Sequence, residues 1–196
     1  MYPVSADLDI LRLLAHHRAP ASTVVARWAM DIGTSGTAIA VVAAVGLVVV
    51  AAKRWWWHGI TIAVSVVSAQ AVARALKQMI QRARPPEDLA VVQVGAFSMP
   101  STVAAMTAAA AVAAYVVLPW PTKYRHRVVA LLAVLVVVIG IAMVYLGAHW
   151  PTDVLAGWSA GFGVGLAVVG LTRVAHRWEI QRKVSDRTDR RHTRPT

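Results

Sequence analysis

The sequence of 196 residues contains no cysteine and few charged residues. Without cysteine the chain can form no disulfide framework, no thiolate nucleophile, no cysteine-ligated zinc site and no iron–sulfur cluster. Only 15% of its residues are charged, whereas an ordinary soluble domain has about a quarter. Apolar residues of the class AVILMFWYC make up 58% of the chain, and the mean hydropathy is +0.57. This composition indicates a protein whose solvent is largely lipid.

Long apolar runs supply the expected membrane spans. A helix that crosses a membrane needs about 20 largely apolar residues. Five such runs follow one another along the chain, at 34–52, 59–80, 101–118, 127–147 and 152–174. We therefore predict an all-α integral membrane helical bundle of about five transmembrane helices, with the membrane domain at 34–174. The length leaves no room for a separate soluble domain.

The segment before the first run, residues 1–33, has charges scattered among its apolar residues. It lacks an uninterrupted apolar core, so it is predicted to be neither a cleavable signal peptide nor a span. Its leucines, among them Leu8, Leu11 and Leu14, favour a short helix lying in the membrane interface. Pro20 is expected to end this helix before a second stretch leads into the first span.

The charges divide by side of the membrane. The formal net charge is +11. The segments 53–58, 119–127 and 173–196 hold 13 basic and 3 acidic residues, and the rest of the chain holds 7 basic and 6 acidic. By the positive-inside rule the first set faces the cytoplasm. We therefore expect an inner (plasma) membrane protein with its N-terminus outside and its C-terminus cytoplasmic.

Residues 175–196 are expected to form a basic cytoplasmic tail. From Gln181 onward we predict disorder, with the basic residues lying against anionic lipid headgroups. Binding of nucleic acid is the less favoured reading of the same charges. The tryptophans support this orientation, because Trp55 to Trp57, Trp120 and Trp178 fall at the inner boundary and Trp28 and Trp150 near the outer one.

Gly157, Gly161 and Gly165 recur every four residues on the fifth run. Such a stripe lets a neighbouring helix approach closely. We interpret it as a packing surface, either within the monomer or in a homo-oligomer, and not as a site of chemistry.

Three polar clusters fall at the outer ends of the spans. In the first, Lys77 and Arg84 are seven residues apart, which would place them on one face of a helix. The second, Pro100-Ser101-Thr102, begins a helix whose free N–H groups and positive dipole end favour an anion. In the third, His149 and Asp153 are four residues apart, so the carboxylate can reach one imidazole nitrogen.

Each cluster also has an ordinary structural interpretation. Lys77 and Arg84 could extend to lipid headgroups, Ser101 and Thr102 could be a simple helix cap, and His149 could be structural. Their convergence on one side of the membrane favours a phosphate pocket that holds a nucleophile. No metal or cofactor is expected in such a site.

The three clusters together resemble the type 2 phosphatidic acid phosphatases, relatives of the bacterial acid phosphatases and vanadium haloperoxidases. The family pattern is Lys, six residues, Arg-Pro; then Pro-Ser-Gly-His; then Ser-Arg, five residues, His, three residues, Asp. The matching residues, within a resemblance that covers about 55–172, are Lys77, Arg84, Pro85, Pro100, Ser101, His149 and Asp153. The resemblance implies an all-helical core, an outward-facing site and a lipid phosphate as substrate. It also implies that His149 attacks phosphorus, that Asp153 holds its tautomer, and that Lys77, Arg84, Ser101 and Thr102 hold the phosphoryl oxygens.

Two departures from the pattern affect the chemistry. The histidine of the second element, which protonates the leaving oxygen in the family, is Val103. The Ser-Arg of the third element is Ala142-Met143, so one phosphate-binding arginine is absent. Loss of a general acid typically costs about 10²- to 10⁴-fold in rate. The glycine of the second element is Thr102, a change also found in the sphingosine-phosphate phosphatase branch.

Two functions follow from this pattern. In the first, the protein hydrolyses a phosphate or diphosphate lipid, phosphatidate-like or isoprenoid, through a phosphohistidine at His149. In the second, a degenerate relative binds phosphorylated lipid or acts as a membrane subunit for a partner, as Val103 and Met143 suggest. A transporter or channel is a third class, disfavoured because no span carries the paired carboxylates that proton coupling uses.

Overall fold

The structure, a computed structural model, describes residues 5–92 and 94–192. Within these residues the fold consists of seven α-helices and two short 3-10 segments, with one isolated β-bridge between Ala83 and Phe97. The α-helices are α1 Ser5–His16, α2 Pro20–Thr34, α3 Gly36–Lys53, α4 Trp56–Ile80, α5 Thr102–Val117, α6 Arg125–Tyr145 and α7 Pro151–His192. The 3-10 segments are η1 Glu87–Leu89 and η2 Thr122–Tyr124. The predicted all-α class is confirmed.

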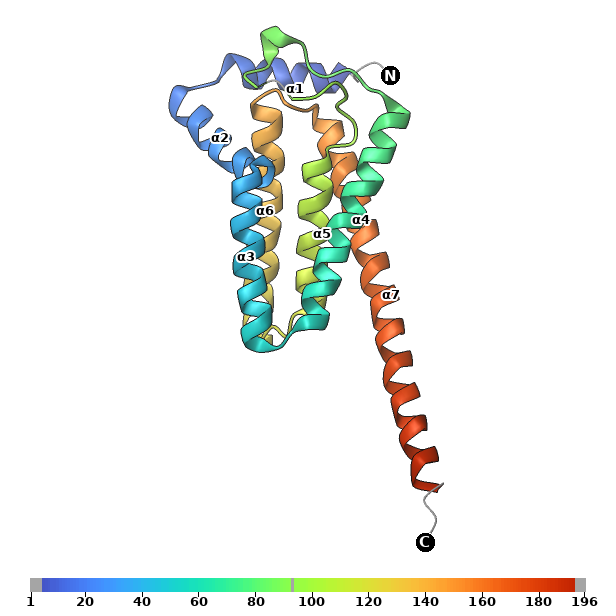
Figure 1. Cartoon of the computed structure of the whole chain (residues 1–196). Helices are drawn as coiled ribbons and strands as arrows, with labels where there is room; N and C mark the ends of the chain where they lie inside the picture. The colour runs from blue at the N-terminus through green and yellow to red at the C-terminus, as the bar shows by residue number, and fades with distance from the viewer. Residues whose placement is uncertain (1–4, 93, 193–196) are drawn as a thin grey trace.

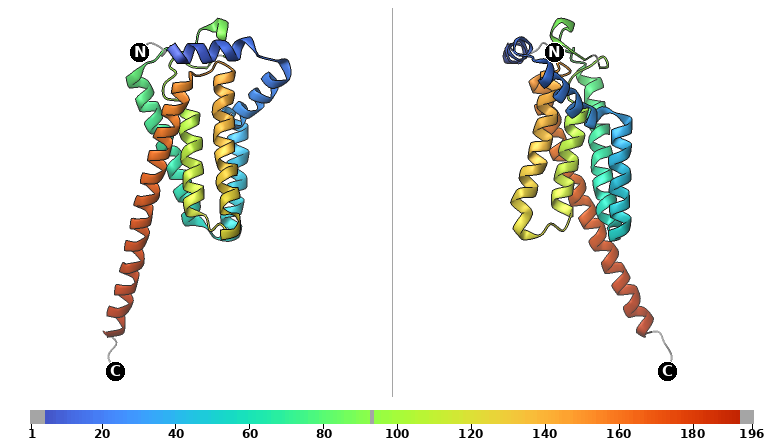
Figure 2. Two further views of the ribbon diagram at one scale, coloured as in Figure 1. Left: turned by 180° about the vertical axis from the view of Figure 1, so that it is seen from behind. Right: turned by 90° about the vertical axis from the view of Figure 1, so that its left-hand side faces the viewer.

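Helices α3 to α7 run side by side as a bundle (Figures 1 and 2). Among the described residues four segments are long and apolar enough to cross a membrane, namely Gly36–Lys53, Trp56–Ile80, Thr122–Tyr145 and Pro151–Glu179. The fifth helix, α5, is apolar but has only 16 residues. At 1.5 Å per residue it is about 24 Å long, shorter than the hydrocarbon layer of about 30 Å. Figure 1 shows α5 beginning deeper in the bundle than the helices around it.

The glycine stripe of α7 packs against α5 within the monomer. A Cβ added to Gly157 would lie 2.5 Å from the carbonyl oxygen of Ser101, and one added to Gly161 would collide with the backbone of Ala105. Farther along, the site of a Cβ on Gly165 lies 3.2 Å from Ala109. Small residues thus let the two helix backbones touch, as expected for helices that associate in lipid. The predicted packing role is confirmed.

The N-terminal helices cover the end of the bundle that carries the polar clusters. Helix α1 lies across this end, and α2 descends obliquely beside α6 (Figure 1). One face of α1 is exposed, including Leu13 at 60%, while Leu11 is fully buried. Pro20 stands at the start of α2, where proline favours the first helical turn. The predicted break between two N-terminal helices is therefore observed.

The C-terminal tail differs from the prediction of disorder from Gln181 onward. Helix α7 continues without interruption to His192 and extends far beyond the bundle (Figure 2). After Gly170 the helix contains no glycine or proline, and arginine, lysine, glutamate and glutamine favour a helix. The predicted disorder is wrong for 181–192, and residues 193–196 lie outside the described part. The two ends of the described chain lie at opposite ends of the bundle.

Candidate active site

The predicted polar clusters meet at one end of the bundle, beneath α1. The end of α4 supplies Lys77, and the connection from α4 to α5 supplies Arg84. The start of α5 supplies Ser101 and Thr102, while the turn between α6 and α7 supplies His149. Asp153 lies in the first turn of α7. Segments far apart in the sequence are thus brought together around His149.

His149 and Asp153 form the centre of the site. Nδ1 of His149 lies 3.5 Å from Oδ2 of Asp153, and both side chains are buried. Oδ2 also accepts a hydrogen bond from the backbone N–H of Trp150 at 2.9 Å, which holds the carboxylate in place. Nδ1 is enclosed, and no closer polar partner for it lies among the described residues. The carboxylate therefore faces Nδ1 and leaves Nε2 as the nitrogen available for a ligand or a reaction.

The imidazole of His149 is neutral at physiological pH. Burial is the main cause that lowers its pKa, to about 4, and the positive charges of Arg84 and Lys77 act in the same direction. Asp153 opposes the shift through its interaction with the imidazole. A neutral imidazole beside two cations has a free electron pair and is placed where an anionic group would be attracted.

Lys77 and Arg84 both lie near His149, but not for the predicted reason. Helix α4 ends at Ile80, and Gln81 adopts the left-handed conformation with φ 49°. Arg84 therefore lies on an extended connection, and the expectation that the two side chains share one helix face is wrong. The guanidinium of Arg84 donates through Nε to the carbonyl of Gly95 and through Nη1 to the carbonyl of Ala148. Arg84 thus joins two loops while keeping its charge close to His149.

Ser101 caps helix α5. Its Oγ accepts a hydrogen bond from the N–H of Ala104 at 3.3 Å, and its own N–H donates to the carbonyl of Asp153 at 2.9 Å. The structural interpretation of Ser101 as a helix cap is therefore correct, and the side chain is fully buried. The neighbouring Thr102 is half-buried and makes no side-chain hydrogen bond within the described residues.

Apolar side chains occupy the two positions at which the family pattern has His and Arg. Val103 is half-buried and packs against α2, where a Cβ on Gly33 would lie 2.7 Å from its Cγ1. Met143 is 1% exposed, and its sulfur accepts a hydrogen bond from Ser101 Oγ at 3.5 Å. Neither Val103 nor Met143 therefore offers a proton donor or a positive charge to the site.

Sequence reasoning missed two residues of the site, Arg82 and Asp7. Nη1 of Arg82 donates to Oδ1 of Asp153 at 2.7 Å, and Nη2 donates to Oδ2 of Asp7 at 2.6 Å. All three side chains are at least 98% buried. A signal existed for Asp7, because it shares a helical face with Leu11, four residues on, and a carboxylate on an apolar face needs a partner. Nothing in the sequence identified Arg82 as that partner.

Trp150 is also placed differently from the prediction. It was expected to anchor the outer boundary, but it is only 3% exposed. Its Nε1 donates to the carbonyl of Ala83 at 3.0 Å, and the guanidinium of Arg82 lies 5.5 Å from its ring centroid. Trp150 therefore packs the site from within, whereas Trp28 is 71% exposed as expected of an interfacial residue.

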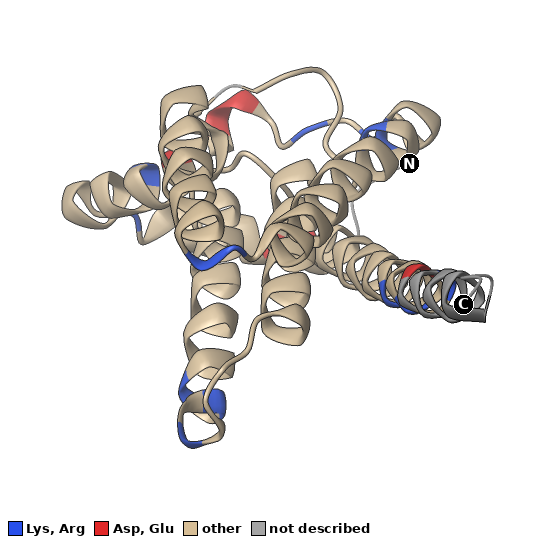
Figure 3. Ribbon diagram, turned by 60° about the horizontal axis from the view of Figure 1, so that its bottom comes forward, with Lys and Arg blue, Asp and Glu red and all other residues tan. Residues whose placement is uncertain are grey.

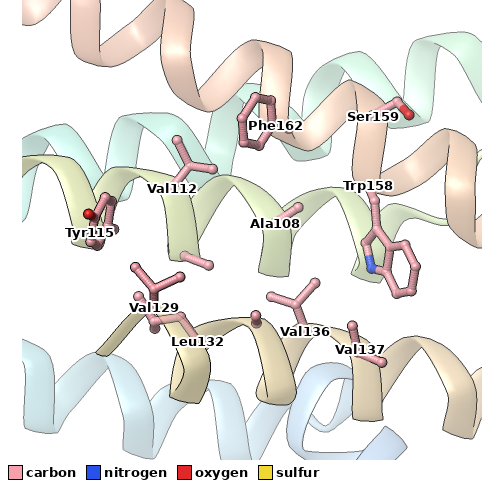
Figure 4. Close-up of a pocket in the computed structure, with 12 residues that line it drawn as sticks. Ala108, Val112, Tyr115, Val129, Leu132, Val136, Val137, Trp158, Ser159 and Phe162 are labelled. Atoms are coloured by element: carbon pink, nitrogen blue, oxygen red, sulfur yellow. The ribbon is translucent and has the colours of Figure 1, made fainter. Parts of the chain in front are cut away.

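One cavity borders the site, and a larger groove lies farther along the bundle. The cavity, of about 210 Å³, is bordered by Arg84 and by the backbone turns at Gly95 and Gly147. The groove, of about 670 Å³, opens on the side of the bundle between α5, α6 and α7. Figure 4 shows its apolar walls, with the indole of Trp158 reaching from α7 to one end of the groove. The groove thus runs along the membrane-crossing part of the protein toward the end that holds His149.

No group of three metal-binding side chains lies together anywhere in the described part of the chain. His149, Asp153 and the two cations instead place a neutral imidazole beside two positive charges, at one end of a membrane-spanning helical bundle. A known family of membrane proteins matches this chain. A family model described as the PAP2 superfamily matches residues 58–177. The chain belongs to the PAP2 superfamily.

Known relatives agree with this assignment. The chain is 32% identical over 130 residues to a phosphatidylglycerophosphatase B of Bacillus subtilis strain 168. That alignment covers 64% of this chain and 63% of the relative, so the chain matches less than two thirds of the relative's length.

Two solved structures share the fold. The first, a transmembrane PAP2-type phosphatidylglycerolphosphate phosphatase from Bacillus subtilis, has a TM-score of 0.76 at 29% identity, covering 86% of this chain and 85% of that one. The second, LpxE of Aquifex aeolicus, has a TM-score of 0.70 at 20% identity, covering 85% and 96%. The protein is therefore a membrane protein similar to lipid phosphatases.

Proposed function

We propose that the protein hydrolyses a phosphate or diphosphate group of a membrane lipid through a phosphohistidine at His149. The observation that carries this proposal is the buried pair of His149 and Asp153, with 3.5 Å between Nδ1 and the carboxylate. A proton on Nδ1 faces that carboxylate, so the electron pair of the neutral ring is on Nε2. Lys77 and Arg84 supply the positive charge that an attacked phosphoryl group requires.

The reaction has two steps. In the first, Nε2 of His149 forms a bond to phosphorus while the bond from phosphorus to the lipid's leaving oxygen breaks. The imidazolium formed in this step is stabilised by Asp153. In the second, water attacks the phosphohistidine, inorganic phosphate leaves and the neutral imidazole returns. Lys77, Arg84 and the amides near Ser101 and Thr102 hold the phosphoryl oxygens during both steps.

The preferred substrate class follows from the absence of a general-acid histidine at position 103. Release of an alcohol from a phosphate monoester requires a proton donor for the leaving oxygen, and Val103 cannot donate a proton. Release of a phosphate monoester from a diphosphate makes a leaving group whose second pKa is about 6, so it needs little help from an acid. We therefore propose that lipid diphosphates are better substrates than lipid monophosphates.

The groove between α5, α6 and α7 supports a lipid as the substrate. Val112, Val136 and Phe162 are among its apolar lining residues, and Trp158 lies at one end of it (Figure 4). A hydrocarbon chain could lie there while its headgroup reaches the small cavity beside Arg84. The Bacillus subtilis relatives are named as phosphatases of phosphatidylglycerophosphate, which is itself a phosphorylated lipid.

Release of inorganic phosphate from lipids tests the proposal. The purified full-length protein is incubated with matched pairs of lipid diphosphates and monophosphates, beside a His149→Gln variant. Phosphate release by the unaltered protein and its loss in the variant are the expected results. Equal release by both proteins would remove His149 from the mechanism.

A second function is binding of phosphorylated lipid without turnover. The observation that favours it is the contact of Ser101 with Met143, which fills the position of an expected phosphate-binding arginine. In this case the unaltered protein releases no phosphate from any lipid. Vanadate or a lipid phosphate would still bind, and Lys77→Gln would weaken that binding.

For the orientation, we propose that the site faces the outside and that 175–196 form a cytoplasmic extension. Figure 3 shows basic residues on turns at the end of the bundle opposite the site and along the extension of α7. The N-terminal segment 1–33 would then cover the outer surface of the membrane domain 34–174. A reporter after Thr196 and one within 119–125 should both indicate cytoplasm, and 86–97 should be accessible from outside. A C-terminal reporter that indicates the outside would overturn this orientation.

A further inference from the structure

Asp7 is a buried charged residue near the site that the proposed reaction does not use. It lies on α1, far along the chain from the other site residues. Its Oδ1 accepts from the backbone N–H of Thr152 at 3.0 Å, and its Oδ2 accepts from Thr152 Oγ1 and from Arg82, each at 2.6 Å. The carboxylate thus binds the first turn of α7, the turn that carries Asp153. Helix α1 supplies this anion from outside the catalytic bundle.

Arg82 connects Asp7 to Asp153. Its Nη1 reaches Oδ1 of Asp153 at 2.7 Å while its Nη2 is taken by Asp7. A guanidinium can hold a carboxylate with two parallel hydrogen bonds, and this is its preferred geometry. Because Asp7 occupies one side of the guanidinium, Arg82 binds only one oxygen of Asp153. The second oxygen, Oδ2, remains turned toward Nδ1 of His149.

The charges of Asp7, Arg82 and Asp153 also favour a role of Asp7 in supporting Asp153. Arg82 is a buried cation between two carboxylates, so the three groups together carry one negative charge. Without Asp7 the positive charge of Arg82 would be balanced by Asp153 alone. The carboxylate of Asp153 would then stabilise a cationic imidazole less effectively, because its charge would already be neutralised nearby.

We propose that Asp7 is a positioning residue of the site, which acts through Arg82 to hold Asp153 in the orientation that fixes His149. The inference rests on the proposed role of His149 as the nucleophile. It gives α1 a function beyond lying at the membrane surface, since the helix completes the chain of contacts that ends at the imidazole. Asp7 touches neither the lipid nor the reacting phosphorus.

The isosteric variant Asp7→Asn tests this role because it removes the charge and keeps the side-chain shape. Asp9→Asn is the matched control, since Asp9 lies on the same helix and is exposed. With a lipid diphosphate, Asp7→Asn should lower kcat by about 10- to 100-fold, the range expected when a supporting contact is lost. KM should change little, because Lys77 and Arg84 are untouched. Asp9→Asn should match the unaltered protein in both constants.

A measurement that needs no turnover separates this inference from the proposed function. In protein labelled with ¹⁵N-histidine, the ring nitrogen shifts give the tautomer of His149, whose signals are assigned by their loss in His149→Gln. The unaltered protein should hold the Nδ1–H tautomer, and Asp7→Asn should populate the Nε2–H tautomer as well. An unchanged tautomer in Asp7→Asn overturns the positioning role, even if the unaltered protein is an active phosphatase. A changed tautomer supports it, even if no lipid is hydrolysed.

A double variant covers the case in which Asp7→Asn does not fold. Asp7→Asn combined with Arg82→Gln removes both buried charges together, which avoids leaving one unpaired. If Asp7 and Arg82 position Asp153, this variant should also lose the single Nδ1–H tautomer. If the pair only fastens α1 to the bundle, the double variant should keep the tautomer of the unaltered protein, and the inference is wrong.

Discussion

The hydroxyl of Ser101 donates a hydrogen bond to the sulfur of Met143 at 3.5 Å. Ser101 is 0% exposed and Met143 is 1% exposed, so the contact is sealed from water and lipid. A thioether is a weak acceptor with no charge, and it occupies the position at which the family pattern places an arginine. In the proposed reaction, the charge of the phosphoryl group is therefore balanced by Lys77 and Arg84 alone.

A proton donor at position 103 should change the substrate preference. Val103→His supplies a donor for the leaving oxygen, so turnover of lipid monophosphates should rise about 10-fold or more, whereas turnover of diphosphates should change little. Phosphate release from the two substrate classes measures the effect. Val103→Leu is the control for size, because Val103 packs against Gly33 of α2 and a larger side chain alone must be accommodated there. Equal rates on both classes in the unaltered protein would mean that another residue supplies the proton.

The two cations should contribute differently to binding and stability. Lys77→Gln should weaken vanadate binding about 10- to 100-fold, because a charge-assisted contact is worth about 1.5–3 kcal/mol. It should not lower the unfolding temperature, because Lys77 makes no side-chain hydrogen bond within the described residues. Arg84→Gln should weaken binding and lower the unfolding temperature, since Arg84 also holds the carbonyls of Gly95 and Ala148. Changing both should abolish vanadate binding.

Arg74→Gln is the control for the loss of a cation from α4, since Arg74 is exposed one turn before Lys77. It should leave vanadate binding as it is in the unaltered protein. If the variant with both Lys77 and Arg84 changed to Gln binds vanadate as tightly as the unaltered protein, these residues do not bind the phosphoryl group. They would then interact with lipid headgroups only.

The pH dependence of kcat reports on the nucleophile. In the proposed reaction, His149 attacks only as the neutral imidazole, and its pKa is lowered to about 4 by burial and by the two cations. Since the pKa lies below the usual value of about 6.5, kcat should stay level as the pH falls from 7 to about 5 and should decline only as it approaches 4. A decline centred near pH 6.5 would mean that the imidazole is exposed to water when substrate is bound.

Two glycines of α7 should respond oppositely to the same substitution. Gly161→Ala places a Cβ against the backbone of Ala105 in α5, and overpacking of this kind costs about 1–3 kcal/mol. Gly163→Ala adds the same methyl group where nothing lies within 4 Å, so stability should be unchanged or higher. Thermal unfolding in detergent micelles compares the two. An equal fall in the unfolding temperature of both variants would show that the glycines act through chain flexibility and not through contact with α5.

Much of the fold could be predicted because lipid imposes simple rules on a sequence. The long apolar runs predicted the helices of the bundle, and the repeated glycines at 157, 161 and 165 predicted a close helix contact. His149 and Asp153 are four residues apart, so their meeting required only a local turn. The weaker predictions concerned places where a helix ends, as at Gln81, or where a polar tail keeps its helical propensity, as after residue 180.

The pairing of Asp7 with Arg82 could not be predicted in the same way. The two residues are 75 positions apart, and neither belongs to a motif that specifies the other. In the sequence, Asp7 is one of several charged residues in an interfacial helix, and Arg82 is one of three basic residues in the stretch from Lys77 to Arg84. Nothing in the sequence distinguishes Arg82 from its basic neighbours as the partner of Asp7. Only the packing of α1 over the bundle selects one charge of each stretch for burial.

The covalent intermediate gives the most direct test of the reaction. The protein is mixed with a lipid diphosphate labelled in its terminal phosphate, quenched in alkali, where phosphohistidine is stable, and digested for mass spectrometry. The label should lie on His149 in the unaltered protein and be absent from His149→Gln. Release of labelled phosphate without label on His149, or label on another residue, would contradict nucleophilic catalysis by this histidine.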